Sequence, residues 1–248
     1  MERAWKARIA TPRVAGFHQP SREVNDEATM KASRRMQHSQ RARAYDALSR
    51  WYSLLSDRSE GPLRKECLNR LRLQTGEAIL EIGPGPGTDL PVMAARVGIT
   101  GSVCGLDLSR GMLRVCRRNL PRDTQASTIR LIQGDGLRLP FRTGMFDVVV
   151  LSFTLELFSE DEIPQVLHEA ARVMRGKGRL GTVSLSNRHP DELATRAYWR
   201  AHRALPAMVD CRPIDAAASL AAHGYELTEN VERSMWGLRV AVLVARKV

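Results

Sequence analysis

A short apolar segment that breaks into alternating glycines constrains this chain more than any other feature. Residues 78–82 are mostly apolar, and three glycines follow them at alternate positions: Gly83, Gly85 and Gly87. Apolar residues then recur with helical spacing over 88–97, so the glycines are predicted to lie on a strand-to-helix turn. Backbone N–H groups and a helix N-terminus face a ligand there, and no Cβ blocks its approach. The turn predicts a nucleotide-type site, but not the G-x-G-x-x-G dinucleotide fingerprint, because Thr88 stands where its last glycine would fall.

Strands and helices are predicted to alternate after this turn. The expected strands are 78–82, 102–107, 128–133, 146–152 and 178–185, with helices at 88–97, 109–119 and 160–175. Such alternation favours a parallel sheet with right-handed crossovers. Helices are also expected at 41–56, 61–73, 190–205 and 213–223, and two closing strands at 225–233 and 238–246.

The run from Glu81 to Gly87 resembles motif I of the class I S-adenosylmethionine (SAM)-dependent methyltransferases. Segments 102–109, 131–141, 146–153 and 172–180 resemble, in the same order, the family's later strand motifs. The resemblance extends over residues 41–246. It implies an α/β fold with a Rossmann-like, seven-stranded and mostly parallel sheet, an antiparallel last strand, helices on both faces and additional N-terminal helices. Within the family the chain is most similar to the ubiquinone/menaquinone C-methyltransferase-like (methyltransferase type 11) branch.

The resemblance implies SAM as the cofactor and S-adenosyl-L-homocysteine as the product. Asp107 is expected to accept the ribose hydroxyls; the alternative role of a helix cap is one that Ser109 already fills. Asp135 matches the acid that meets the adenine amino group, or else it forms a local Asx-turn. Glu81 either orients the glycine turn, meets the amino group of the methionine part, or only stabilises the turn. The expected cofactor-binding residues are Glu81, Gly83, Gly85, Gly87, Asp107, Leu108, Met112, Asp135, Gly136 and Ser152.

Other residues of this set are less specific. Leu108 and Met112 are expected to cover the adenine or ribose, although their spacing also suits a core. Ser152 is expected to face the methionyl end. Pro84 and Pro86 stiffen the glycine turn, and Pro86 removes an amide donor from it, while the glycine backbones stay available.

The acceptor site is not fixed by any motif. Segment 187–213, after the fifth strand, concentrates polar and aromatic residues, and His202 is the candidate general base because imidazole titrates near neutrality. A structural histidine is the alternative, and residues 210–213 can equally form a salt-bridged helix entry. Tyr45 and Tyr52 lie on one side of the helix expected at 41–56, facing either the acceptor or the core. The candidate acceptor-binding residues are Tyr45, Tyr52, Phe153, Asn187, Tyr198, His202 and Arg212.

The charge and aromatic content of the chain limit the kinds of partner that it can bind. The net charge is +11, and residues 1–40 hold eight Lys/Arg against four Asp/Glu. We read 1–40 as a basic flexible arm and 41–248 as the methyltransferase domain. The arm is either a solvated composition bias or a surface for anionic membranes; only 5% aromatic residues argue against specific nucleic-acid binding. The four cysteines lack metal-ligand spacing, so no metal site is expected and reduced thiols in a cytoplasmic protein are predicted.

Methyl transfer needs mainly in-line positioning and exclusion of water, since the sulfonium is already activated. The sequence predicts transfer to a small or lipid-like acceptor, with C-methylation of a quinone precursor favoured. Phospholipid or other small-molecule methylation and a non-catalytic SAM-binding regulator are the alternatives. Amino-directed DNA methylation is disfavoured because strand four ends in Leu151-Ser152-Phe153-Thr154 rather than N/D-P-P-Y/F. The oligomeric state stays open.

Overall fold

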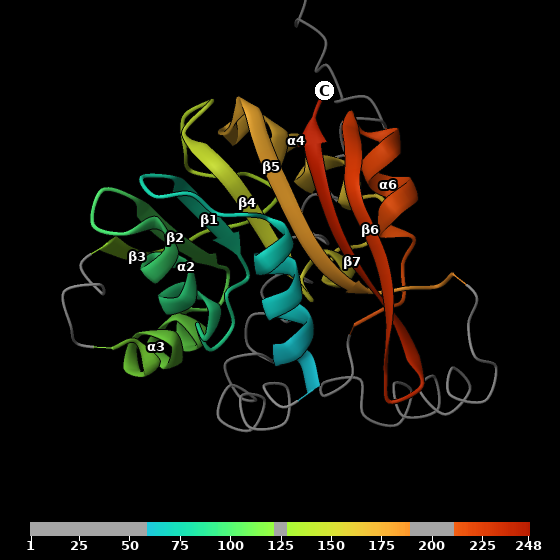
Figure 1. Cartoon of the computed structure of the whole chain (residues 1–248), viewed down its shortest axis with the longest axis horizontal. Helices are drawn as coiled ribbons and strands as arrows, with labels where there is room; N and C mark the ends of the chain where they lie inside the picture. The colour runs from blue at the N-terminus through green and yellow to red at the C-terminus, as the bar shows by residue number, and fades with distance from the viewer. Residues whose placement is uncertain (1–58, 122–127, 189–210) are drawn as a thin grey trace, which may run out of the picture. The chain divides into compact units, whose positions relative to one another are not determined.

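The computed structural model describes residues 59–121, 128–188 and 211–248. Within them one seven-stranded sheet has the order β3-β2-β1-β4-β5-β7-β6 (Figure 1). The strands are β1 (Ala78–Ile82), β2 (Ser102–Asp107), β3 (Ile129–Gln133), β4 (Phe146–Ser152), β5 (Met174–Leu185), β6 (Tyr225–Met235) and β7 (Leu238–Lys247). Strands β1 to β5 pair in parallel, and β7 is antiparallel to both of its neighbours. The predicted fold class is confirmed.

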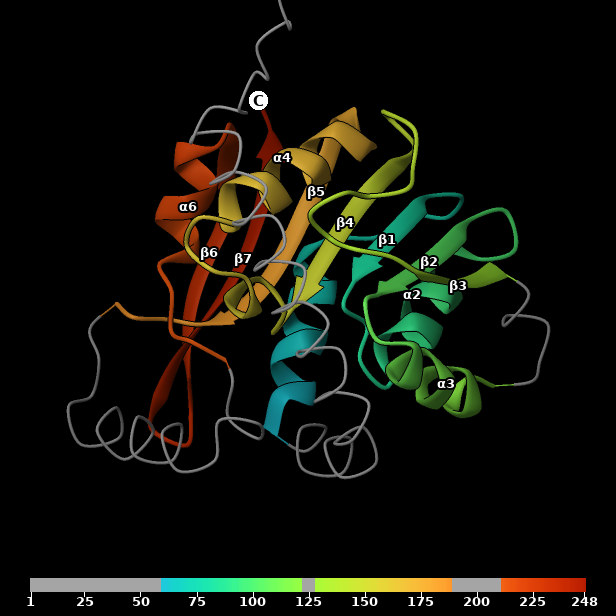
Figure 2. The same cartoon turned by 180° about the vertical axis from the view of Figure 1, so that it is seen from behind.

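Helices cover both faces of this sheet (Figures 1 and 2). A helix at residues 59–70, α2 (Asp89–Val97) and the inner side of α3 (Arg110–Asn119) pack on one face. Helix α4 (Ile163–Val173), α6 (Ala216–Ala222) and the short 3-10 helix η2 (Leu155–Leu157) pack on the other. The carboxyl ends of the five parallel strands therefore meet at one edge, where ligands bind in open α/β sheets.

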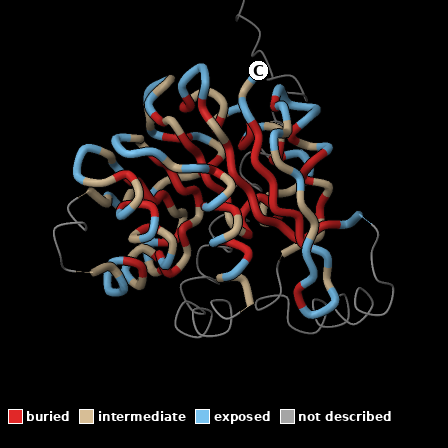
Figure 3. The backbone as a smooth tube through the Cα atoms, in the orientation of Figure 1, coloured by how far each residue is buried: buried red, intermediate tan, exposed pale blue. Residues whose placement is uncertain are grey.

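Buried residues follow the strands and leave the loops exposed (Figure 3). In the central strand β1, Ile79 belongs to the core under α2, whereas Leu80 and Ile82 belong to the core under α4. The pleat alternates side chains between the two faces, so Glu81 lies on the same face as Ile79. A carboxylate thus occupies a core position at the end of a buried strand.

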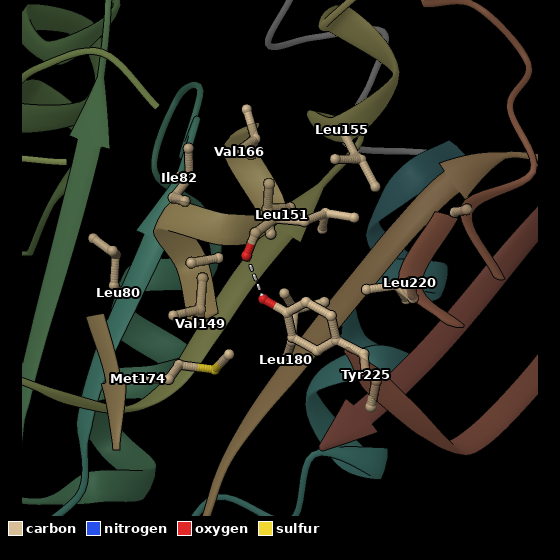
Figure 4. Close-up of a cluster of buried hydrophobic side chains, with 14 of the residues drawn as sticks. Leu80, Ile82, Val149, Leu151, Leu155, Val166, Met174, Leu180, Leu220 and Tyr225 are labelled. Atoms are coloured by element: carbon tan, nitrogen blue, oxygen red, sulfur yellow. Dashed lines mark hydrogen bonds between the residues drawn. The ribbon is translucent and has the colours of Figure 1, made fainter. Parts of the chain in front are cut away.

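The core under α4 includes one buried polar contact (Figure 4). The Tyr225 hydroxyl donates to the carbonyl oxygen of Leu167 over 2.7 Å, which joins β6 to α4. Burial raises the pKa of the Tyr225 phenol, so it stays protonated and continues to donate.

Most predicted elements match, and one junction is corrected. Strands β1, β2 and β4 have the predicted bounds. The helix predicted at 160–175 is α4, which spans only Ile163–Val173, and β5 begins at Met174 rather than 178. Pro164 stands in the first turn of α4, where proline is tolerated, and Met174 pairs with Phe146 as strand. The helices expected at 41–56 and 190–205, and the boundary at residue 40, lie outside the described residues.

Candidate functional site

The glycine turn joins β1 to α2 in a conformation that favours glycine. Gly83, Gly85 and Gly87 have φ of 70°, 53° and 81°. The Gly83 amide donates to the Leu106 carbonyl of β2 at 2.8 Å, and the Gly87 amide donates to the Pro84 carbonyl at 2.9 Å. The turn is therefore fixed at both ends.

Neighbouring side chains pack directly against this turn. A Cβ on Gly83 would lie 2.7 Å from Thr154 Cγ2, and one on Gly87 would collide with Cys116 Sγ. A Cβ on Gly85 would meet nothing within 4 Å. Packing against neighbouring side chains thus requires glycine at positions 83 and 87, whereas Gly85 faces open space.

The prolines of the turn still offer their backbone carbonyls as hydrogen-bond acceptors. Pro86 lacks an N–H, as expected, but its carbonyl accepts a hydrogen bond from Asn119 Nδ2 at 3.1 Å. This contact ties the turn to the end of α3.

Glu81 is the most unusual polar residue of the site. It is 2% exposed, and its Oε2 accepts no hydrogen bond from the described residues. Burial raises the pKa of the carboxyl well above its usual range, as do the nearby charges of Asp89 and Asp107, while Arg64 opposes the rise. A buried carboxylate with an unsatisfied oxygen suits a cationic ligand group, such as the ammonium of SAM.

Asp107 ends β2 beside the N-terminus of α3. Its Oδ1 accepts from the Ser109 amide at 2.8 Å, and the Ser109 hydroxyl in turn accepts from the Met112 amide at 3.0 Å. Ser109 is thus the helix cap, as expected, and Asp107 also holds the turn before it. Leu108 is half-buried, whereas Met112 is buried.

Asp135 and Gly136 follow the end of β3. Asp135 Oδ1 accepts from the Leu137 amide at 2.9 Å, the Asx-turn geometry that the sequence left as an alternative. Gly136 is buried, and a Cβ there would lie 3.0 Å from the Phe158 ring.

The end of β4 returns toward the glycine turn. The hydroxyl oxygen of Thr154 lies 3.3 Å from the Gly83 carbonyl oxygen and 3.0 Å from that of Ser152. Phe153 has a φ of 50° and is 6% exposed, packed in the core under α2. Its expected role at the acceptor stays a prediction. Ser152 itself is half-buried.

Acceptor candidates are only partly described. Asn187 is exposed, and its amide donates to the Ile214 carbonyl at 3.2 Å. Arg212 donates to the Phe158 carbonyl at 3.0 Å and lies 3.4 Å from Glu160 Oε1, so its side chain braces the loop after η2. Tyr45, Tyr52, Tyr198 and His202 lie outside the described residues.

Several residues that build this site are not among the predicted ones. Arg64 and Asp89 form an ion pair beneath the glycine turn, and Thr154 and Cys116 pack against it. An acidic residue in the first turn of a helix is a common signal, which could have identified Asp89. Arg64 precedes the turn in another helix, and no spacing rule connects them. Within the part of the chain that the structure describes, no three His, Cys, Asp or Glu residues group as metal ligands.

Sequence comparison shows similarity to methyltransferases. Residues 79–178 match the family model of a methyltransferase domain. The chain is 30% identical over 142 residues to the demethylmenaquinone methyltransferase of Oceanobacillus iheyensis, covering 57% of each chain. The aligned region thus spans less than two thirds of that relative.

Solved structures share the fold. A SAM-dependent methyltransferase from Aquifex aeolicus superimposes with a TM-score of 0.60 at 19% identity, over 81% of this chain and 98% of the other. The cyclase SpnF superimposes with a TM-score of 0.61 at 18% identity, over 75% of this chain and 80% of the other. The sheet order, glycine turn and strand-end acids accord with the methyltransferase domain model that residues 79–178 match, and the chain is similar to SAM-dependent methyltransferases, whose methyl donor is SAM.

Proposed function

We propose that this chain transfers the methyl group of SAM to a small or lipid-like acceptor, by C-methylation of a quinone precursor. The observation that carries SAM binding is the buried Glu81, whose Oε2 accepts no hydrogen bond from the described residues. Asp107 and Asp89 lie near enough to raise its pKa further. A site with this negative charge favours a cofactor that brings an ammonium and a sulfonium.

The chain's own residues bind and orient the cofactor in this proposal. The glycine backbones admit it closely, the carboxylates of Asp107 and Asp135 make polar contacts to it, and the apolar residues exclude water. SAM supplies the activated methyl group, so in-line positioning is the main task of the protein. The proposed cofactor residues are Glu81, Gly83, Gly85, Gly87, Asp107, Leu108, Met112, Asp135, Gly136 and Ser152.

The quinone precursor is supported by sequence similarity to a demethylmenaquinone methyltransferase at 30% identity. Tyr45, Tyr52, Tyr198 and His202 remain proposed acceptor residues, with His202 as the base if the acceptor must lose a proton. Asn187 is exposed and close in sequence to this segment, so we retain it as well.

We also propose peripheral contact of residues 1–40 with an anionic membrane surface, on the basis of their positive charge. Among the described helices, none combines the length and apolar character needed to cross a bilayer. Deleting residues 1–40 should leave SAM binding intact and reduce binding to vesicles that contain phosphatidylglycerol. Equal vesicle binding by both proteins would contradict the contact.

The fold alone does not decide the reaction, because the cyclase SpnF shares it. The deciding experiment is calorimetric titration with SAM, followed by a methyl-release assay with a demethylated menaquinone analogue and with phospholipid. Methylation of the analogue supports the proposal. Binding without turnover on any acceptor supports a regulator, and turnover on phospholipid alone supports the other enzyme class.

A further inference from the structure

Arg64 is a buried cation on the helix at residues 59–70, outside the segment matched by the family model. It is 8% exposed, and its Nε lies 3.1 Å from Asp89 Oδ2. Its Nη2 donates to Thr88 Oγ1 at 3.0 Å, and its Nη1 donates to Glu60 Oε2 at 3.2 Å. One guanidinium therefore contacts the exit of the glycine turn, the first turn of α2 and its own helix.

The contact to Thr88 changes how α2 begins. Thr88 is the N-cap residue, but its side chain makes no capping hydrogen bond and accepts from Arg64 instead. The amides at this end of α2 are thus not used by the cap side chain, and helix N-terminal amides attract negatively charged ligand groups. Arg64 holds the helix end in place of an ordinary cap.

The charges around Arg64 explain why a cation is needed. Asp89 and Asp107 both act electrostatically on Glu81, which is almost fully buried. Crowded carboxylates in a poorly solvated site favour protonation, which would remove the negative charge that a cationic ligand requires. Among the described residues, the positive charge that opposes this effect at Glu81 belongs to Arg64.

We propose that Arg64 is a positioning residue for SAM, which joins the helix at 59–70 to the glycine turn and supplies the counter-charge for the buried Glu81. This inference rests on the proposed binding of SAM. A purely structural ion pair is the competing explanation, since buried pairs by themselves are weak indicators of added stability. The two explanations differ in how ligand affinity depends on pH.

The test is calorimetric titration of SAM into the full-length protein from about pH 5.5 to about pH 9. SAM affinity should fall at acid pH as Glu81 becomes protonated, and we call this fall the acid limb of the affinity profile. In Arg64→Gln the acid limb should move to higher pH, because Glu81 then ionises without its counter-charge. We expect a loss of about tenfold or more at the acid end of this range, and the loss should narrow toward the alkaline end, because a higher pH favours ionisation of Glu81 even without the counter-charge. In a Glu81→Gln background, Arg64→Gln should no longer move the limb.

Arg70→Met is the matched control. Arg70 lies on the same helix but pairs with Glu66 at 2.7 Å and Glu229 at 2.8 Å, away from the glycine turn. Its variant should melt at a lower temperature and keep the wild-type pH profile of SAM affinity. A shifted limb in Arg70→Met as well would make the effect non-specific and overturn the proposal.

The proposal would also be overturned if Arg64→Gln left the acid limb of SAM affinity unshifted, or lowered the affinity equally at every pH. If that variant does not fold, Arg64→Lys decides, because lysine keeps the charge but lacks the planar fork. A lower affinity with an unchanged limb supports positioning, and wild-type affinity contradicts it. Absence of SAM binding by the wild-type protein would instead refute the proposed function, which separates the two failures.

Discussion

A buried carboxylate with an unsatisfied oxygen is unfavourable for folding, and Glu81 is such a residue. Its pKa is raised in the folded protein, so its contribution to stability is full below the unfolded pKa of about 4.3 and is lost as the pH rises through the folded pKa. At neutral pH, where the side chain is ionised in the unfolded chain, Glu81 therefore opposes folding. Sites that keep such groups trade stability for function.

Glu81→Gln should thus raise the melting temperature at pH 7 and weaken SAM binding. A gain of about 1 kcal/mol would raise the melting temperature by about 2–4 °C in a domain of this size. The gain should shrink as the pH falls toward 4, where wild-type Glu81 is also neutral. Scanning calorimetry at several pH values, with SAM titrations at pH 7, measures both effects.

Glu169→Gln is the control variant, for which we expect the opposite change in melting temperature. Glu169 accepts from Arg172 at 2.7 Å and from the Leu139 amide at 2.8 Å, and these contacts lower its pKa despite partial burial. Its stabilisation is present above the unfolded pKa and is lost as the pH falls through the folded pKa. Glu169→Gln should therefore lower the melting temperature at pH 7. A lower melting temperature for Glu81→Gln too would contradict our account of Glu81.

Asp107 should matter to the ligand more than to the fold. Asp107→Asn keeps an oxygen for the Ser109 amide but loses the charge, whereas Asp107→Ala loses both. Two charge-assisted hydrogen bonds to a ribose are worth about 1.5–3 kcal/mol each at most. We expect SAM affinity to fall in the order wild type, Asn, Ala, with nearly unchanged melting of the Asn variant. Unchanged affinity in Asp107→Ala would disprove the ribose assignment.

At the scale of elements, the glycine turn offers a matched pair of substitutions. Gly87→Ala places a methyl group against Cys116 at a φ of 81°, whereas Gly85→Ala meets open space at a φ of 53°. Left-handed backbone costs alanine about 1–2 kcal/mol in both cases, and the collision adds to it only at 87. Urea denaturation should show the larger loss for Gly87→Ala. Equal losses would mean that Cys116 moves aside freely.

Hydrophobic alternation and glycine placement predict most of the elements here. Strand β1 and the turn after it are local signals, so their bounds agree with the structure. The end of α4 depends on the pairing of Met174 with Phe146, across a register shift in β4, and no local pattern contains that partner. Arg64 was missed for the same reason: its contacts to Thr88 and Asp89 are made only when two helices pack together.

At the scale of the whole molecule, three of the four cysteines are enclosed by the two cores. Cys67 and Cys116 lie under α2, and Cys104 lies in the core under α4; all three are buried free thiols. Burial raises the pKa of Cys67 and Cys116 to about 12 and that of Cys104 to about 11. Cys211 is half-buried.

The thiolate is the reactive form, so thiol reactivity reports on both cores. At about pH 8 the folded protein should react rapidly with Ellman's reagent at Cys211 alone, and Cys211→Ser should abolish that fast phase. The buried thiols should react at the rate of unfolding, which SAM should slow because it binds the folded state. Their raised pKa values also predict that stability declines above about pH 9, where the unfolded thiols ionise and the folded ones do not. Rapid reaction of any thiol in folded Cys211→Ser protein would show that a core opens locally. Comparing each thiol variant would then identify which face of the sheet is the less stable.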